Sequence, residues 1–224
     1  MIRRDKAARQ TLAARTQQHD LFDADPVLPD GFLYRPDFIT GEEEASLLAS
    51  LRELPFREAK YKEFTAKRRT VSYGGQYNFS RNRLESAPPV ASFLLPLREK
   101  VARWAGVAPE AFSHSLINEY QPGTPLGWHR DAPDFEIVAG VSLGGRARMR
   151  LRPYRPREKH RREDVIVLEL EPRSAYIMRD TGRWGWQHCI SETKELRYSI
   201  TFRTHKDPRR FVAPHRAQRR AQFG

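Results

Sequence analysis

At 224 residues the chain is long enough to form one domain with a sizeable hydrophobic core. Its 40 Lys and Arg against 28 Asp and Glu give a net charge of +12, which favours a polyanionic partner such as nucleic acid. The single cysteine, Cys189, excludes an intramolecular disulfide, and the absence of a membrane-length apolar run or an apolar signal segment favours the cytoplasm.

The excess of basic residues is concentrated in three segments. Residues 57–69 hold six basic and two acidic residues, residues 146–162 hold nine and one, and the stretch from 203 onward holds seven and one. Clustering of this kind indicates a nucleic-acid partner rather than general solubility. It does not distinguish DNA from RNA.

Two helices are predicted in the first half of the chain. Thr40 is followed by three glutamates, which is typical of a helix N-cap with acidic residues in the first turn. Leucines at helical spacing follow until Pro55. Residues 96–105 form a second amphipathic pattern, which Gly106 ends. We expect the first helix to pack against a sheet.

Between these helices, residues 71–73 and 77–79 flank Gly74 and Gly75, which predicts two short strands joined by a tight turn. Basic residues surround the aromatic side chains of this segment. Aromatic rings stack on bases while Arg and Lys bind phosphates, so the combination favours a nucleic-acid site. The same aromatics could equally belong to a core.

The second half of the chain predicts short strands at 137–143, 146–152, 165–170 and 175–178. Within 146–152, four arginines alternate with apolar residues, so one face of that strand is basic. Such a face is either the solvated outside of a sheet or a contact surface for phosphates.

Two early helices followed by many short strands with Gly and Pro turns indicate an α+β, mainly β fold. We expect a double-stranded β-helix of the jelly-roll type, buttressed by the N-terminal helices. The expected domain spans 26–206, after a polar basic extension at 1–25 and before a basic tail at 207–224. We expect a monomer.

The stretch from Ser115 to Asp131 ends in His129-x-Asp131. If a strand runs from Leu126 to Asp131, the imidazole and the carboxylate project from the same face, roughly 6–7 Å apart. With a second His, such a pair forms the facial triad that binds non-haem Fe(II) and leaves positions open for oxygen and a co-substrate. His188, near the far end of the chain, can supply that second imidazole.

The run from Arg197 to Arg203 alternates strictly between apolar and polar residues. One face is therefore a core face, and the other carries two guanidinium groups suited to binding a carboxylate. Arginines inside a barrel are costly without an anionic partner. Arg197 is the first choice for the distal carboxylate of a diacid, because Arg203 lies roughly 20 Å further along the strand.

The order H-x-D, a distant His, then R-x-S-x-T-x-R resembles the AlkB family of Fe(II)/2-oxoglutarate dioxygenases of the bacterial alkylation-repair type. The Asn118-x-Tyr120 pair also resembles the pair that contacts the co-substrate in that family. The resemblance covers about residues 28–206. It implies Fe(II) bound by His129, Asp131 and His188, with O₂ as co-substrate. It implies 2-oxoglutarate bound by Asn118, Tyr120, Arg197, Ser199 and Arg203.

The resemblance further implies oxidative demethylation of N-alkylated bases in DNA or RNA, coupled to conversion of 2-oxoglutarate to succinate and release of formaldehyde. A nucleotide-recognition lid would lie at about 57–83, where Tyr77 and Phe79 match the positions that close over a flipped base. The expected substrate-binding residues are Arg69, Tyr73, Tyr77, Phe79 and Asp134.

The loop after the metal motif departs from the family's pattern. In DNA-repair members an acidic residue two positions after the metal Asp reads the methylated base. Here that position is Pro133, and Asp134 follows one place later. Either Asp134 substitutes through a reshaped loop, or the base preference differs.

Two other functions compete with nucleic-acid demethylation. The same iron site could act on a protein or a small molecule, because one fold hosts many substrates. A non-catalytic basic β-domain that binds nucleic acid is the third hypothesis, and it requires no iron. The basic clusters and the lid aromatics favour the first hypothesis.

Overall fold

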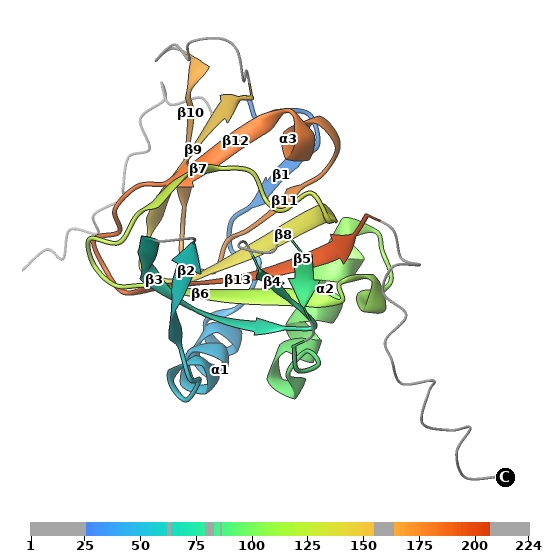
Figure 1. Cartoon of the computed structure of the whole chain (residues 1–224), viewed down its shortest axis with the longest axis vertical. Helices are drawn as coiled ribbons and strands as arrows, with labels where there is room; N and C mark the ends of the chain where they lie inside the picture. The colour runs from blue at the N-terminus through green and yellow to red at the C-terminus, as the bar shows by residue number, and fades with distance from the viewer. Residues whose placement is uncertain (1–25, 62–63, 79–82, 86, 155–163, 207–224) are drawn as a thin grey trace, which may run out of the picture.

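The computed structural model describes residues 26–61, 64–78, 83–85, 87–154 and 164–206. Within these residues two antiparallel sheets face each other, and two of the helices lie against the outer face of the larger sheet (Figure 1). None of the helices described is long and apolar enough to cross a membrane. The architecture is the helix-buttressed, mainly β sandwich that the sequence predicts.

The larger sheet has seven strands in the order β1-β11-β8-β13-β6-β3-β2. Along the chain these are β1 (Phe32–Arg35), β2 (Arg57–Tyr61), β3 (Phe64–Tyr73), β6 (His114–Tyr120), β8 (Phe135–Gly144), β11 (Ala175–Met178) and β13 (Arg197–His205). The smaller sheet has the order β10-β9-β12-β7. Its strands are β7 (Leu126–His129), β9 (Ala147–Pro153), β10 (Ile166–Leu170) and β12 (Trp186–Ile190).

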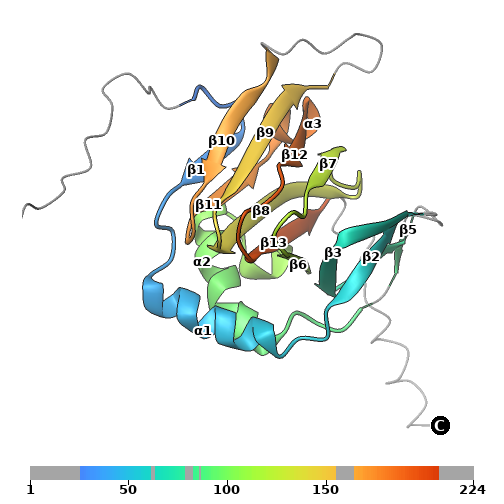
Figure 2. The same ribbon diagram turned by 90° about the vertical axis from the view of Figure 1, so that its left-hand side faces the viewer.

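The remaining elements connect or cover the sheets. They are β4 (Gln76–Asn78), β5 (Arg83–Glu85), helices α1 (Gly41–Arg52), α2 (Leu95–Ala105) and α3 (Asp180–Trp184), and 3-10 turns at Ser92–Leu94 and Pro109–Ala111. Figure 2 shows α1 and α2 on one side of the large sheet and the small sheet on the other.

Local chemistry fixes the ends of the two long helices. Thr40 accepts a hydrogen bond from the Glu43 amide (3.1 Å), and Glu43 accepts one from the Thr40 amide (2.7 Å), so α1 begins with a capping box. Gly106 ends α2 in the left-handed region, at φ 72°. Lys100 binds Glu43 at 2.7 Å and links the two helices.

Strict alternation in β13 separates two cores. Tyr198, Ile200 and Phe202 pack with the helices in a core that includes Leu51 and Val101. The second core lies between the sheets. The other face of β13 points into the same inter-sheet space, and it carries the two predicted arginines, both buried. The buried polar face of the strand is therefore confirmed.

The sequence wrongly predicted a hairpin around Gly74. Both strands form, but β3 pairs with β2 and β6, whereas β4 pairs with β5. Gly74 adopts φ 75°, and its amide donates to the carbonyl of Pro88 at 2.6 Å. A Cβ at this position would lie 1.8 Å from the Ser113 carbonyl oxygen. This close approach turns the chain out of the large sheet before β4 begins.

Candidate metal centre and co-substrate slot

The three predicted metal ligands converge at one end of the inter-sheet space. His129 ends β7 and pairs across the sheet with His188 in β12, and their ring centroids lie 4.2 Å apart. One ligand atom from each of His129, Asp131 and His188 lies within 4.8 Å of the other two. Asp131 follows β7 rather than lying in it, because the strand ends at His129.

An irregularity in β7 turns His129 inward. Leu126 pairs with Ile190 and His129 pairs with His188, so three steps along β7 match two steps along β12. Such a bulge re-aims the side chains that follow it. Leu126 therefore packs into the inter-sheet core while His129 still faces His188.

Hydrogen bonds orient the donor atoms. The Nδ1 of His129 lies 2.9 Å from the carbonyl oxygen of Gly127, which leaves Nε2 as the ligand atom. The Nε2 of His188 lies 3.7 Å from Oδ2 of Asp131. Two imidazole nitrogens from neighbouring strands and one carboxylate oxygen from the segment after β7 match the donor set of a mononuclear iron(II) site.

Burial lowers the pKa of His188 to about 3 and also lowers that of His129, so both imidazoles are neutral near pH 7. Burial alone would raise the pKa of Asp131, but the adjacent guanidinium of Arg203 holds it well below its usual range. The three side chains are thus in the protonation states that metal binding requires.

Two arginines hold the Asp131 segment in place. Arg203 in β13 donates from Nε (3.1 Å) and Nη2 (2.9 Å) to Oδ1 of Asp131, which leaves Oδ2 facing His188. Arg183 in α3 donates from Nη2 to the carbonyl oxygens of Asp131 (3.1 Å) and Ala132 (2.7 Å). Arg203 therefore reaches the metal end of the site.

The register of β6, β13 and β8 arranges polar side chains in rows across the large sheet. Asn118, Ser199 and Ser142 form one row of directly paired residues. Tyr120 and Arg197 form the next row. All five side chains are buried on the face that the metal ligands share. Four of them were predicted from the sequence to bind the co-substrate, and Ser142 was not.

Arg197 is 1% exposed, so its guanidinium charge is buried and would be stabilised by an anionic partner. Its Nε donates to Oγ of Ser142 at 3.0 Å, and its guanidinium lies 5.0 Å from the ring centroid of Tyr120. Among the described residues, no group accepts a hydrogen bond from its buried Nη1. A buried cation with an unused donor fits a carboxylate ligand.

A family model for the 2OG-Fe(II) oxygenase superfamily matches residues 31–203, most of the chain. The chain belongs to this superfamily. With the His129, Asp131 and His188 cluster, membership identifies iron(II) and 2-oxoglutarate as metal and co-substrate, as predicted. The buried Nη1 of Arg197, which has no acceptor among the described residues, fits the 2-oxoglutarate carboxylate.

The relatives of this oxygenase are AlkB-like. It is 28% identical to an "Alkylated DNA repair protein ALKBH8 homolog" of Arabidopsis thaliana, over 82% of this chain and 58% of that protein. It is 30% identical to a "Probable RNA/DNA demethylase ALKBH6" of Danio rerio, over 57% of this chain and 52% of that protein. The chain thus spans little more than half the length of these relatives.

Two further comparisons complete the family placement. An uncharacterised mimivirus protein, L905, is 25% identical over 78% of this chain and 84% of its own length. The structure of OsALKBH1 superposes with a TM-score of 0.65 at 14% identity, covering 80% of this chain and 99% of that one. This likeness confirms the predicted double-stranded β-helix fold.

Tyr176 of the oxygenase lies in the same space and was missed from the sequence. It lies in β11 opposite Gly140, where an added Cβ would lie 2.4 Å from the tyrosine ring. Burial raises the pKa of Tyr176, as does the charge of Asp131, while Arg197 opposes the shift. The ring therefore extends over Gly140 toward the co-substrate slot. The apolar run that contains Tyr176 offered no signal of this.

Two of the expected substrate-binding residues lie on the far face of the large sheet. Arg69 pairs with Glu119 through Nη2 (2.6 Å), and Tyr73 packs against the helical core. Both point away from the metal, so their positions argue against substrate contact. The preceding residue, Arg68, faces the metal side of the sheet, and its charge adds to the effect of burial in lowering the pKa of His129.

The remaining substrate candidates are placed less fully. Tyr77 lies in β4, and Phe79 lies outside the described residues. Asp134 precedes β8 in the loop after the metal motif, where its carbonyl oxygen accepts from the Lys206 amide at 2.9 Å. Burial lowers the pKa of His205, and the charge of Asp134 opposes that shift. These roles stay predictions.

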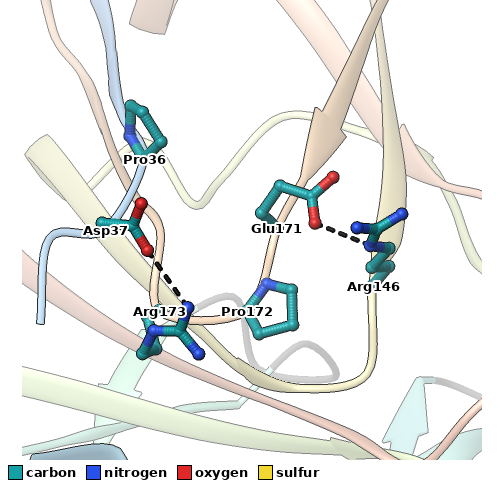
Figure 3. Close-up of a pocket in the computed structure, with 6 residues that line it drawn as sticks. All are labelled: Pro36, Asp37, Arg146, Glu171, Pro172 and Arg173. Carbon is teal, nitrogen blue, oxygen red and sulfur yellow. Dashed lines mark hydrogen bonds and ion pairs between the residues drawn. The ribbon is translucent and has the colours of Figure 1, made fainter. Parts of the chain in front are cut away.

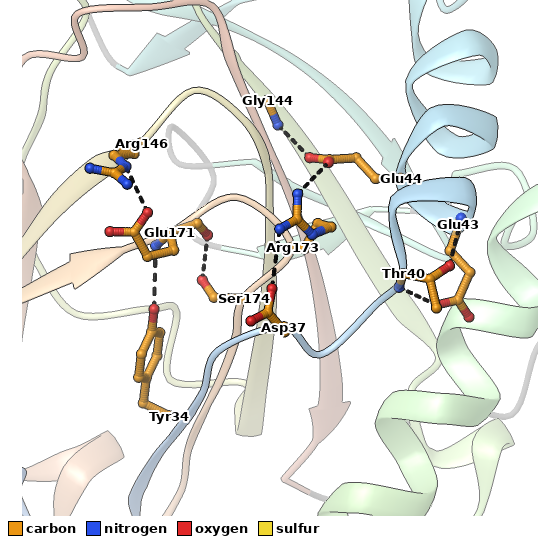
Figure 4. A network of polar contacts seen from close by, with 10 residues as sticks. All are labelled: Tyr34, Asp37, Thr40, Glu43, Glu44, Gly144, Arg146, Glu171, Arg173 and Ser174. Carbon is orange, nitrogen blue, oxygen red and sulfur yellow. Dashed lines mark hydrogen bonds and ion pairs between the residues drawn. The ribbon is translucent and has the colours of Figure 1, made fainter. Parts of the chain in front are cut away.

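A second polar cluster surrounds a cavity of about 300 Å³ beside the start of β9 (Figure 3). Arg173 binds Asp37 at 3.1 Å, and Glu44 of α1 accepts a hydrogen bond from the Gly144 amide at 2.9 Å (Figure 4). Arg146 pairs with Glu171. Two arginines face three carboxylates in this cluster, and the contacts of Glu44 with Gly144 and Arg173 fasten α1 to the sheet.

Proposed function

We propose that this oxygenase removes N-methyl groups from bases of DNA or RNA. Oxygen and 2-oxoglutarate would be consumed, and succinate, carbon dioxide and formaldehyde released. The convergence of His129, Asp131 and His188, together with a buried Arg197 donor that no described residue accepts, carries the oxygenase part of this proposal. The net charge of +12 and the nucleic-acid activities in the names of two relatives support the substrate class.

Iron(II), when bound, supplies oxidation of a C–H bond by O₂ at the expense of 2-oxoglutarate. The protein's residues fix the ligand geometry: the Gly127 carbonyl holds the tautomer of His129, and the Arg203 fork fixes the Asp131 carboxylate. The Arg203–Asp131 pair is buried, whereas the Gly127 carbonyl belongs to the exposed edge strand β7. The ligands are therefore held in place before metal arrives.

The buried polar rows of the large sheet would orient 2-oxoglutarate. Arg197 would bind its distal carboxylate, with Tyr120 against the guanidinium and Ser142 holding Nε. Asn118 and Ser199 lie in the adjacent row and would donate hydrogen bonds to the same molecule. Arg203 would hold Asp131 through Nε and Nη2. Its buried Nη1 would face the end of the co-substrate that lies nearest the metal.

The methylated base would reach the metal from the side of the lid. Tyr77 and Phe79 would close over it, as the family resemblance implies, and Arg68 adds positive charge near His129. A base within a duplex must leave the stack first, and a methyl group that blocks pairing makes this easier. Once the methyl carbon carries a hydroxyl, the carbon–nitrogen bond breaks and formaldehyde leaves.

One panel tests the proposal. Oligonucleotides containing 1-methyladenine or 3-methylcytosine, as single- and double-stranded DNA and RNA, are incubated with Fe(II) and 2-oxoglutarate, and formaldehyde is measured. We expect release from at least one methylated strand and none from unmethylated controls. His188→Ala should abolish release while the variant still binds the strand.

The main alternative is an oxygenase of proteins or small molecules. It predicts 2-oxoglutarate turnover that no methylated oligonucleotide stimulates, and no formaldehyde from any strand of the panel. That outcome would overturn the nucleic-acid proposal and leave the iron site intact.

A further inference from the structure

The basic run of β9 divides into two halves with different partners. Arg146, 74% exposed, pairs with Glu171 at 2.7 Å, and Arg148 pairs with Glu169 at 2.6 Å. These two charges are neutralised by their neighbours. The run is therefore not a uniformly basic stripe, and half of it is ordinary sheet surface.

The other half stacks on a tryptophan. The guanidinium carbons of Arg152 and Arg150 lie 4.2 and 5.1 Å from the ring centroid of Trp128. Arg152 donates from Nε to Gln187 at 3.0 Å. Within the described part of the chain, neither arginine pairs with a carboxylate, and the buried Nε of Arg150 has no partner. Their positive charge is uncompensated there.

A third arginine repeats this arrangement nearby. The guanidinium carbon of Arg130 lies 3.6 Å from the ring centroid of Tyr154, which is 37% exposed. Stacking on a ring holds a guanidinium flat while its edge N–H groups remain able to bind phosphate oxygens. Arginine and aromatic side chains together are typical of surfaces that bind single-stranded nucleic acid.

Trp128 lies in β7 and the arginine pair lies in β9, the two neighbours of β12, while Arg130 and Tyr154 directly follow the ends of β7 and β9. The arginines of β9 alternate with residues buried between the sheets, so they face outward. Trp128 directly precedes His129, and Leu151, between Arg150 and Arg152, pairs with His188. Strand β7 is also the edge strand of the small sheet. Figure 2 shows it on the same side of the molecule as β2 and β3, which belong to the expected lid. A nucleic-acid strand bound to these residues would pass round the β7 edge to reach the expected lid.

We propose that Trp128, Arg130, Arg150, Arg152 and Tyr154 form an outer face that binds the sugar–phosphate backbone of single-stranded nucleic acid beside the target base. The inference rests on the proposed function and deepens it by naming a binding surface. Charge complementarity supports it, because the guanidinium groups of Arg150 and Arg152 have no carboxylate partner among the described residues and β9 pairs with the strand that carries His188. The contacts are to phosphate, so binding along this face does not depend on sequence.

The test compares two double variants that remove equal charge from one strand. R150Q/R152Q removes the stacked pair, and R146Q/R148Q, the matched control, removes the paired arginines. Anisotropy of a labelled, unmethylated single strand of about 16 nucleotides, as DNA and as RNA, reports affinity across a range of salt concentrations. The full chain loaded with Mn(II) is used, and melting temperatures check that each variant folds.

We expect R150Q/R152Q to weaken binding roughly tenfold and to reduce the slope of log K against log salt by about 1.4, which is two contacts at about 0.7 each. R146Q/R148Q should change both quantities much less. Equal effects of the two double variants would overturn the inference, because net charge alone would then explain binding. If R150Q/R152Q fails to fold, R130Q is measured against R146Q with the same criterion.

Failure of this inference and failure of the proposed function give different results. If the protein is a demethylase but the outer face does not bind nucleic acid, methylated strands still yield formaldehyde. In that case R150Q/R152Q binds them as tightly as R146Q/R148Q does. If demethylation is wrong, no strand yields formaldehyde, whatever the binding data show.

Discussion

At the scale of single residues, Arg197 and the metal ligands differ in how their charge is compensated. Asp131 receives two hydrogen bonds from Arg203 inside the fold. Arg197 has Ser142 and the Tyr120 ring as neutral partners and a buried donor with no acceptor among the described residues. A buried cation in such surroundings opposes folding until an anion arrives.

Replacing Arg197 with Met should therefore separate stability from binding. The variant should melt no lower than wild type without 2-oxoglutarate, and its affinity for 2-oxoglutarate should fall by about 30-fold or more, since hydrogen bonds to a charged group contribute about 2–3 kcal/mol. Calorimetry of the Mn(II)-loaded protein measures the affinity, and Arg148→Met is the control, because Arg148 pairs with Glu169 on the surface of the small sheet. Unchanged affinity would show that the diacid binds elsewhere.

His114 supplies a pH-dependent effect. Burial lowers its pKa well below the ordinary value, helped by the charges of Arg203 and His205, so the folded protein keeps it neutral. The unfolded chain takes up a proton near pH 6.5, so the contribution of His114 to stability is complete above that pH and is lost as pH falls toward the folded pKa.

Below pH 6.5, the free energy of unfolding of wild type should fall faster than that of His114→Gln. The difference between the two proteins should change by up to about 1.4 kcal/mol for each pH unit. Urea unfolding of both metal-free proteins at several pH values measures this difference, and contributions from the metal-site histidines cancel. A difference that does not vary with pH would contradict a neutral buried His114.

At the scale of elements, helix α3 positions the metal motif from outside it. Its residue Arg183 binds the carbonyl oxygens of Asp131 and Ala132. Five residues without amphipathic repetition give too little pattern for a helix to be predicted. The sequence therefore revealed the ligand but not the side chain that holds its backbone.

Arg183→Met should weaken Mn(II) binding about tenfold or more, as loss of a residue that orients a ligand commonly does, although it does not touch the metal. Calorimetric Mn(II) titration measures the effect, and Arg179→Met, at the N-terminus of the same helix, should bind metal as wild type does. Lower thermal stability with undiminished Mn(II) affinity would reduce Arg183 to a purely structural role.

Strand β3 shows why part of the site could not be predicted. A shift of one residue along a strand exchanges its two faces, and local alternation does not favour Arg69 over Arg68. The register comes from pairing with β6, where Arg69 lies opposite Glu119. The His129-x-Asp131 pair still converges with His188 although β7 ends at His129, because Arg203 and Arg183 hold the Asp131 segment.

At the scale of the whole molecule, the double-stranded β-helix was predictable because helix caps, alternating runs and turns agreed with one another. Tyr176 was not predictable, since its place depends on Gly140 in a distant part of the chain. The fold brings β7, β12 and β13 together, so residues from 129 to 203 form one centre with metal ligands at one end and Arg197 in the slot.

The central claim is that this centre holds iron(II) and 2-oxoglutarate together, and the most direct measurement is an anaerobic spectroscopic titration. Chelation of iron(II) by a 2-oxo acid gives a visible charge-transfer absorption that neither component gives alone. We predict this band for wild type, a requirement for much higher 2-oxoglutarate in Arg197→Met, and no band in His188→Ala. A wild-type protein that shows no band at saturating iron(II) and 2-oxoglutarate would contradict the account.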